Sequence, residues 1–128
     1  MMPILLDTHT ALWWWCNSPL LSAAARSIIA HEPIVHVSAI SAYEVANKYR
    51  LGKLGEIGDP GLRFPALMAA HGFLSLAVSE NHTLAAGLLP GAHHDPFDRI
   101  IAAQALAEGF MVVTCDPELA AFGCKVLW

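Results

Sequence analysis

Two carboxylates, two imidazoles and one guanidinium occur within seven consecutive residues, in the segment 93–99 with the sequence HHDPFDR. The residues that follow, 100–107, are almost wholly apolar, which predicts a helix buried in the centre of the domain. Asp95 is a good N-cap for this helix, Pro96 suits its first position, and Asp98 lies near the positive end of the helix dipole. The two acids are therefore either helix-start residues only, or Asp98 points into a cleft, where a bare carboxylate needs a cation.

Three further acids lie where a strand is expected to meet a helix, or inside a helix. Asp7 and Asp116 each follow a short apolar run and precede a helix start, and Glu44 lies within the helix after the second strand. Because the carboxyl ends of parallel strands share one edge of a sheet, these acids and Asp98 can converge there. Each also has a simpler explanation. Asp7 and Asp116 suit turns or helix caps, and Glu44 suits an ion pair with Lys48 one turn later.

Four carboxylates at one edge would repel one another and shift their own pKa values unless cations were present. One or two Mg²⁺ or Mn²⁺ ions would remove that cost, because hard cations prefer oxygen ligands. Such ions activate water and stabilise charge on a phosphodiester, so the implied chemistry is metal-dependent phosphoryl hydrolysis. The sequence offers no serine–histidine–acid triad, glycine-rich phosphate loop or dinucleotide fingerprint as a competing site.

The elements that must position these acids alternate between apolar strands and helices. This alternation predicts an α/β fold, a three-layer α/β/α sandwich around a mostly parallel sheet of four to five strands. Thr8 or Thr10 is expected to cap the first helix, and Ser38 or Ser41 the third. The expected strands are 3–6, 33–37, 73–78, 110–114 and 124–127, and the expected helices are 11–15, 22–31, one through 49, 64–71, 79–86, 97–108 and 118–121.

Composition agrees with one domain of this kind. A chain of 128 residues can bury a proper core, and 55% hydrophobic against 14% charged residues predicts elements that are buried on more than one side. The net charge of −4 argues against a generally basic nucleic-acid binder but not against a local site. Cys16, Cys115 and Cys124 lack paired spacing, which favours reduced thiols. Without a signal peptide or an apolar run of about 18 residues, we expect a cytoplasmic protein with no membrane association.

Four motifs occur in order along the chain, with the triplet GKL (52–54) after the second: LLDTH (5–9), SAISAYE (38–44), HDPFDRIIAAQA (94–105) and VTCD (113–116). Together they resemble the PIN domain, and more narrowly the VapC-type toxins of bacterial type II toxin–antitoxin systems, over nearly the whole chain. The resemblance implies a single PIN domain over residues 1–128. It also implies an endoribonuclease that cuts single-stranded regions of transfer, ribosomal or messenger RNA and inhibits translation. A homodimer and a cognate VapB-type antitoxin that covers the acidic cleft are implied as partners.

The same resemblance assigns roles to the acids. Asp7, Glu44, Asp98 and Asp116 match the catalytic quartet around Mg²⁺ or Mn²⁺. Asp7 and Asp98 are expected to bind the ion directly, with Glu44 and Asp116 completing its shell partly through water.

Secondary candidates near this quartet are Asp95, Arg99, Thr114 and Lys48. Arg99 is expected to contact substrate or to pair with a neighbouring acid. The hydroxyl of Thr114 is expected to orient Asp116 or a water molecule. His93 and His94 are expected to be structural.

Four other classes of protein are alternatives to this resemblance. A haloacid-dehalogenase-like phosphatase needs a second aspartate two positions after the first, where His9 stands. A receiver domain needs a lysine at the end of its last core strand, where Cys115 and Asp116 stand. A non-catalytic protein-binding module would use the acids only as caps and the cluster Trp13–Trp15 as its working surface. Another metal-dependent phosphohydrolase is also an alternative.

Overall fold

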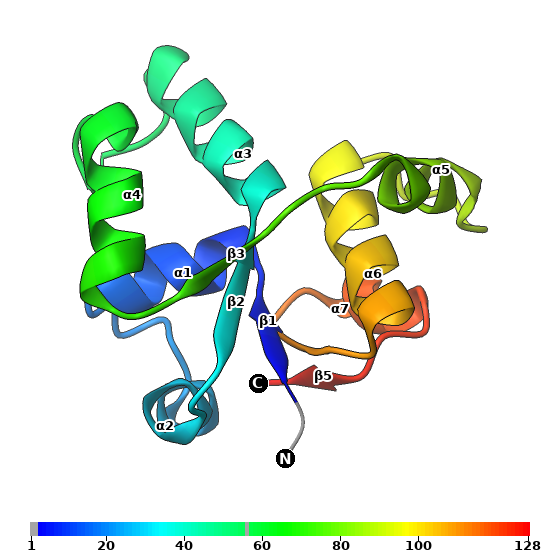
Figure 1. Cartoon of the computed structure of the whole chain (residues 1–128), viewed down its shortest axis with the longest axis horizontal. Coiled ribbons are helices and arrows are strands. Elements are labelled where there is room, and N and C mark those ends of the chain that lie inside the picture. The colour runs from blue at the N-terminus through cyan, green and yellow to red at the C-terminus, as the bar shows by residue number, and fades with distance from the viewer. Residues whose placement is uncertain (1–2, 56) are drawn as a thin grey trace.

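The computed structural model describes residues 3–55 and 57–128, which form a five-stranded sheet with helices on both faces (Figure 1). Every pair of neighbouring strands is parallel, and the strand order is β3-β2-β1-β4-β5. The predicted α/β fold with a central parallel sheet is confirmed. The strands are β1 (Ile4–Leu6), β2 (Val35–Ser38), β3 (Leu74–Leu76), β4 (Met111–Val113) and β5 (Val126–Leu127).

The helices all lie in the connections between successive strands. Their bounds are α1 (Thr8–Trp15), α2 (Ala23–His31), α3 (Ala39–Arg50), α4 (Pro60–Ala70), α5 (Glu80–Leu88), α6 (Pro96–Glu108) and α7 (Pro117–Ala121).

Two helix starts differ from the prediction. Helix α1 begins at Thr8, because Asp7 is its N-cap and accepts a hydrogen bond from the Thr10 amide; neither threonine is the cap. Helix α4 begins at Pro60 rather than at 64, because Asp59 caps it and the proline occupies the first position. The glycines around this Asp-Pro pair favoured a loop there, although an acid before a proline is also a helix-start signal.

The central strand β1 is buried from both sides, which explains the high apolar content. Ile4 and Leu6 belong to a core cluster with residues of α1, α2, α3 and α4. Leu5 points to the opposite face and packs with residues of α6 and α7. Figure 1 shows these two groups of helices on either side of the sheet, with α5 packed against α6.

Helix α6 begins and ends as predicted. Asp95 caps it, with one carboxylate oxygen accepting from the amides of Phe97 (2.9 Å) and Asp98 (3.3 Å). Gly109 ends it in the left-handed conformation, at φ +73°. Its middle, 101–105, is buried, whereas 106–108 is exposed. Asp98 is thereby held in the first turn of a helix that is anchored in the core.

The cysteines of the described chain are free thiols, as predicted. Within residues 3–55 and 57–128, none of the helices has both the length and the apolar character that a membrane span requires.

Candidate functional site

A cavity of about 510 Å³ opens at the carboxyl edge of the sheet, where Asp7 follows β1 and Asp116 lies beyond the end of β4. The four acids of the predicted quartet all line it, although they come from four different parts of the chain. The cavity is lined by Asp7, Thr8, His9, Trp13, Glu44, Lys48, Asp95, Phe97, Asp98, Cys115, Asp116 and Pro117.

Asp7 is held by hydrogen bonds to both of its carboxylate oxygens. One oxygen accepts from the Thr10 amide at 2.8 Å, and the other accepts from the hydroxyl of Thr114. The same hydroxyl accepts the backbone N–H of Asp116 at 3.0 Å. Thr114 therefore links two acids of the cavity. It contacts Asp116, as the sequence predicted, and it also orients Asp7.

Glu44 enters the cavity from α3 and is 6% exposed. Its Oε1 accepts from the hydroxyl of Thr8 at 2.6 Å, and its Oε2 lies 3.1 Å from Nζ of Lys48. The hydroxyls of Thr8 and Ser41 lie 2.9 Å apart. The predicted ion pair is thus present, and Glu44 lines the cavity as well.

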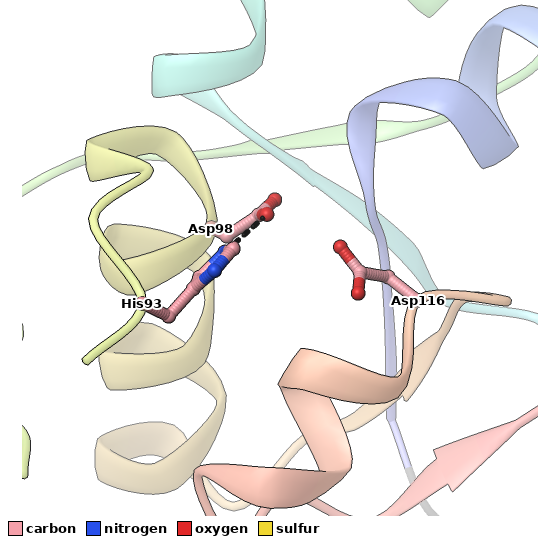
Figure 2. A group of neighbouring side chains, drawn as sticks. All are labelled: His93, Asp98 and Asp116. Carbon is pink, nitrogen blue, oxygen red and sulfur yellow. Dashed lines mark hydrogen bonds and ion pairs between the residues drawn. The ribbon is translucent and has the colours of Figure 1, made fainter. Parts of the chain in front are cut away.

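The side chains of Asp98 and Asp116, which both line the cavity, point toward each other, and His93 lies beside Asp98 (Figure 2). One ligand atom from each of these three residues lies within 4.8 Å of the others. Nε2 of His93 lies 2.9 Å from Oδ2 of Asp98, and its Nδ1 lies 3.8 Å from Oε2 of Glu118. From the sequence, His93 was expected to be structural, and its contact with Asp98 was not predicted.

The electrostatics of the cavity show how closely its acids are gathered. Burial raises the pKa of Asp98 to about 6, with the nearby carboxylates of Asp95 and Asp116 adding to the rise and the hydrogen bond to His93 opposing it. The hydrogen bond to Asp98 in turn raises the pKa of His93. Carboxyl groups that repel one another in a half-buried site, with an imidazole beside them, form a donor set that suits a divalent cation.

Asp95 and Arg99 differ in their relation to the cavity. Asp95 lines it while capping α6. Arg99 does not line it, and donates instead to the carbonyls of Ala86 (3.0 Å), His93 (2.7 Å) and Leu89. In the described part of the chain no carboxylate pairs with Arg99, so the expected ion pair is not found. Its guanidinium holds the loop that carries His93.

Thr8, Ser41 and His93 are the site residues that sequence reasoning missed. A weak signal existed for two of them: Thr8 directly follows Asp7, and Ser41 lies one helical turn before Glu44. His94, which was also expected to be structural, is exposed.

Comparisons with known proteins point to one family. A family model described as PIN domain matches residues 4–123. Ribonuclease VapC22 of Mycobacterium tuberculosis is 32% identical over 120 residues, which are 93% of this chain and 91% of that protein.

Two solved structures share the fold at low sequence identity. VapBC2 from Rickettsia felis, bound to a DNA fragment from its promoter, has a TM-score of 0.70 at 16% identity and 98% coverage of both chains. The sarcin–ricin loop cleaving toxin VapC20 of Mycobacterium tuberculosis has a TM-score of 0.64 at 14% identity, with 94% of this chain and 95% of that chain covered.

Proposed function

The chain belongs to the PIN domain family, and from this premise we propose that it is a metal-dependent endoribonuclease that cuts single-stranded regions of RNA. One observation carries the proposal: Asp7, Glu44, Asp98 and Asp116 come from distant parts of the chain and line a single cavity. Capping alone explains Asp7 and Asp116, but it does not explain why Glu44, inside a helix, and Asp98 reach the same cavity.

The acids would hold Mg²⁺ or Mn²⁺, with Asp7 and Asp98 as direct ligands and Glu44 and Asp116 completing the shell. When bound, the ion supplies activation of water and stabilisation of charge on the phosphodiester. The chain's own groups prepare this site. The hydroxyls of Thr114 and Thr8 donate hydrogen bonds to the carboxylates of Asp7 and Glu44 and so help to orient them at the cavity. Lys48 adds a positive charge at the cavity wall, from which it can contact a phosphate.

The biological setting is inferred from relatives. Because one relative is named a ribonuclease and one structural neighbour a sarcin–ricin loop cleaving toxin, we infer that this chain is a toxin that cuts transfer, ribosomal or messenger RNA and thereby inhibits translation. Because another neighbour is a VapBC complex, a cognate VapB-type antitoxin is the expected partner. The proposal includes a homodimer and a cytoplasmic location.

The test is cleavage of fluorescent single-stranded RNA by the purified chain during a titration with Mn²⁺. Asp98→Asn should lower cleavage about 100-fold or more, since even residues that only support metal ligands cost 10- to 100-fold. Asp59→Asn is the matched control, because Asp59 is an exposed helix cap away from the cavity and asparagine caps equally well. Undiminished cleavage by Asp98→Asn, or cleavage without metal, would reject the site. Failure to cut any RNA would favour the alternative function, a non-catalytic protein-binding module.

A further inference from the structure

Three consecutive tryptophans on α1 lie in three different surroundings, because each residue turns the helix by about 100°. Trp15 packs edge-on against Phe64, with ring centroids 5.2 Å apart, and belongs to the core. Trp14 donates its indole N–H to Nδ1 of His71 at 3.1 Å. Trp13 lines the acidic cavity. All three tryptophans pack against the core, but among them only Trp13 also lines the acidic cavity.

Trp13 is part of an aromatic rim on that side of the cavity. The ring centroid of His9, one turn earlier on α1, lies 5.8 Å from that of Trp13. The ring centroid of Trp128 lies 5.7 Å from that of Trp13. His9 is exposed, Trp128 is 36% exposed and Trp13 is half-buried. Partly exposed aromatic side chains, His9 and Trp13, therefore line the cavity beside the carboxylates.

Lys48 lies between this rim and the acids. Its Nζ is 3.1 Å from Oε2 of Glu44 and 3.4 Å from Nε2 of His9. An ammonium group only donates hydrogen bonds, so Nε2 of His9 is the acceptor in this contact. A cation and aromatic faces therefore meet within one stretch of the cavity wall.

Single-stranded RNA is bound by the combination of a cation for its phosphates and aromatic faces for its bases. We propose that Trp13 and His9 form a base-binding site, on which a nucleotide next to the cleaved phosphate stacks while Lys48 contacts the backbone. This inference deepens the proposed function and rests on it. Stacking supplies attraction that the chain's net charge of −4 and its acidic cavity do not provide.

The first test compares steady-state kinetics of variants on a labelled oligonucleotide that spans a mapped cleavage site. Trp13→Leu should raise KM about 5- to 100-fold, the range expected for loss of one stacked base, with a smaller change in kcat. Trp13→Phe should retain most of the affinity. Trp14→Leu is the matched control, because it removes a neighbouring indole that does not line the cavity. Equal KM values for Trp13→Leu and wild type would overturn the proposal.

The second test changes the RNA, because Trp13 also packs against the core and its replacement can disturb folding. For the wild-type protein, removing one base at a time from the oligonucleotide should raise KM at one position beside the cleaved bond. In Trp13→Phe the same base removal should raise KM less than in wild type. In Trp13→Leu it should not raise KM at all. An effect that persists in Trp13→Leu would contradict the assignment.

If no RNA is cut, the proposed reaction fails but the aromatic site is still tested. Fluorescence anisotropy of labelled octaadenylate then measures binding directly. Weaker binding by Trp13→Leu than by Trp14→Leu supports the site, and equal binding by the two variants overturns it.

Discussion

Two acids of the cavity are each held by a hydroxyl group from another part of the chain. Thr114 donates to Asp7, and Thr8 donates to Glu44. These hydroxyls are buried, Thr114 at 2% and Thr8 at 3% exposure, so each hydrogen bond is made away from competing water. The orientation of these two carboxylates therefore depends on the hydroxyl groups of Thr114 and Thr8.

Replacing Thr114 by valine should lower Mn²⁺ affinity and RNA cleavage about 10- to 100-fold, because the substitution keeps the shape of the side chain and removes the hydroxyl that orients Asp7. Thr114→Ser should keep most of both. Isothermal titration with Mn²⁺ measures the affinity, and circular dichroism checks the fold. Equal behaviour of the valine and serine variants would show that the hydroxyl is not needed.

The three thiols should differ in reactivity in the native protein. Burial raises the pKa of Cys124 to about 11, so at pH 8 only about one molecule in a thousand carries the reactive thiolate. Burial and the nearby Asp7 carboxylate also raise the pKa of Cys115. Titration with a chromogenic disulfide at pH 8 should modify the exposed Cys16 first and Cys124 only after denaturation. One common rate for all three would contradict the described burial.

For single residues, the acids and the ion pair between Glu44 and Lys48 could be predicted from the sequence, but the contacts that Thr8 and His93 make with the acids could not. Thr8 has the residue type and position of a helix cap, and only the packing of α1 against α3 directs its hydroxyl to Glu44. His93 reaches Asp98 because Arg99 holds the preceding loop through backbone carbonyls. Contacts of this kind depend on a loop path that no local pattern specifies.

Helix α6 shows how an element places a functional group. The cap Asp95 and the left-handed Gly109 define its two ends, and its buried middle anchors it, so Asp98 is presented at a set depth in the cavity. These end signals are local, which is why the sequence predicted them correctly. The start of α4 was not predicted correctly, because the glycines around Asp59 and Pro60 favoured a loop, although the Asp-Pro pair is an equally local signal for a helix start.

Two glycine substitutions should change stability in opposite directions. Gly109→Ala should lower the free energy of unfolding by about 1 kcal/mol, because its φ of +73° is strained for alanine even though space is free around it. Gly87→Ala, within α5 and with no atom within 4 Å of the added methyl group, should raise it by up to about 1 kcal/mol. Urea denaturation measures both. A stabilising Gly109→Ala would contradict the described helix end.

For the molecule as a whole, the parallel sheet brings distant residues to one edge. Strand β1 lies between β2 and β4, so Asp7 after β1, Asp116 beyond β4 and Glu44 on the helix after β2 reach a common cavity. Alternating apolar runs were enough to predict a parallel sheet with helices on both faces. The strand order was not predicted, because it depends on which helix faces pack together across the sheet.

The proposed function depends on the binding of a divalent cation by the acids of this cavity. Crystals grown with Mn²⁺ and measured at a wavelength where manganese scatters anomalously test it directly. We expect an anomalous peak in the cavity, about 2.1 Å from carboxylate oxygens of Asp7 and Asp98, and its loss in Asp98→Asn. A protein saturated with Mn²⁺ that shows no peak there, or that binds the ion equally well as Asp98→Asn, would contradict the claim.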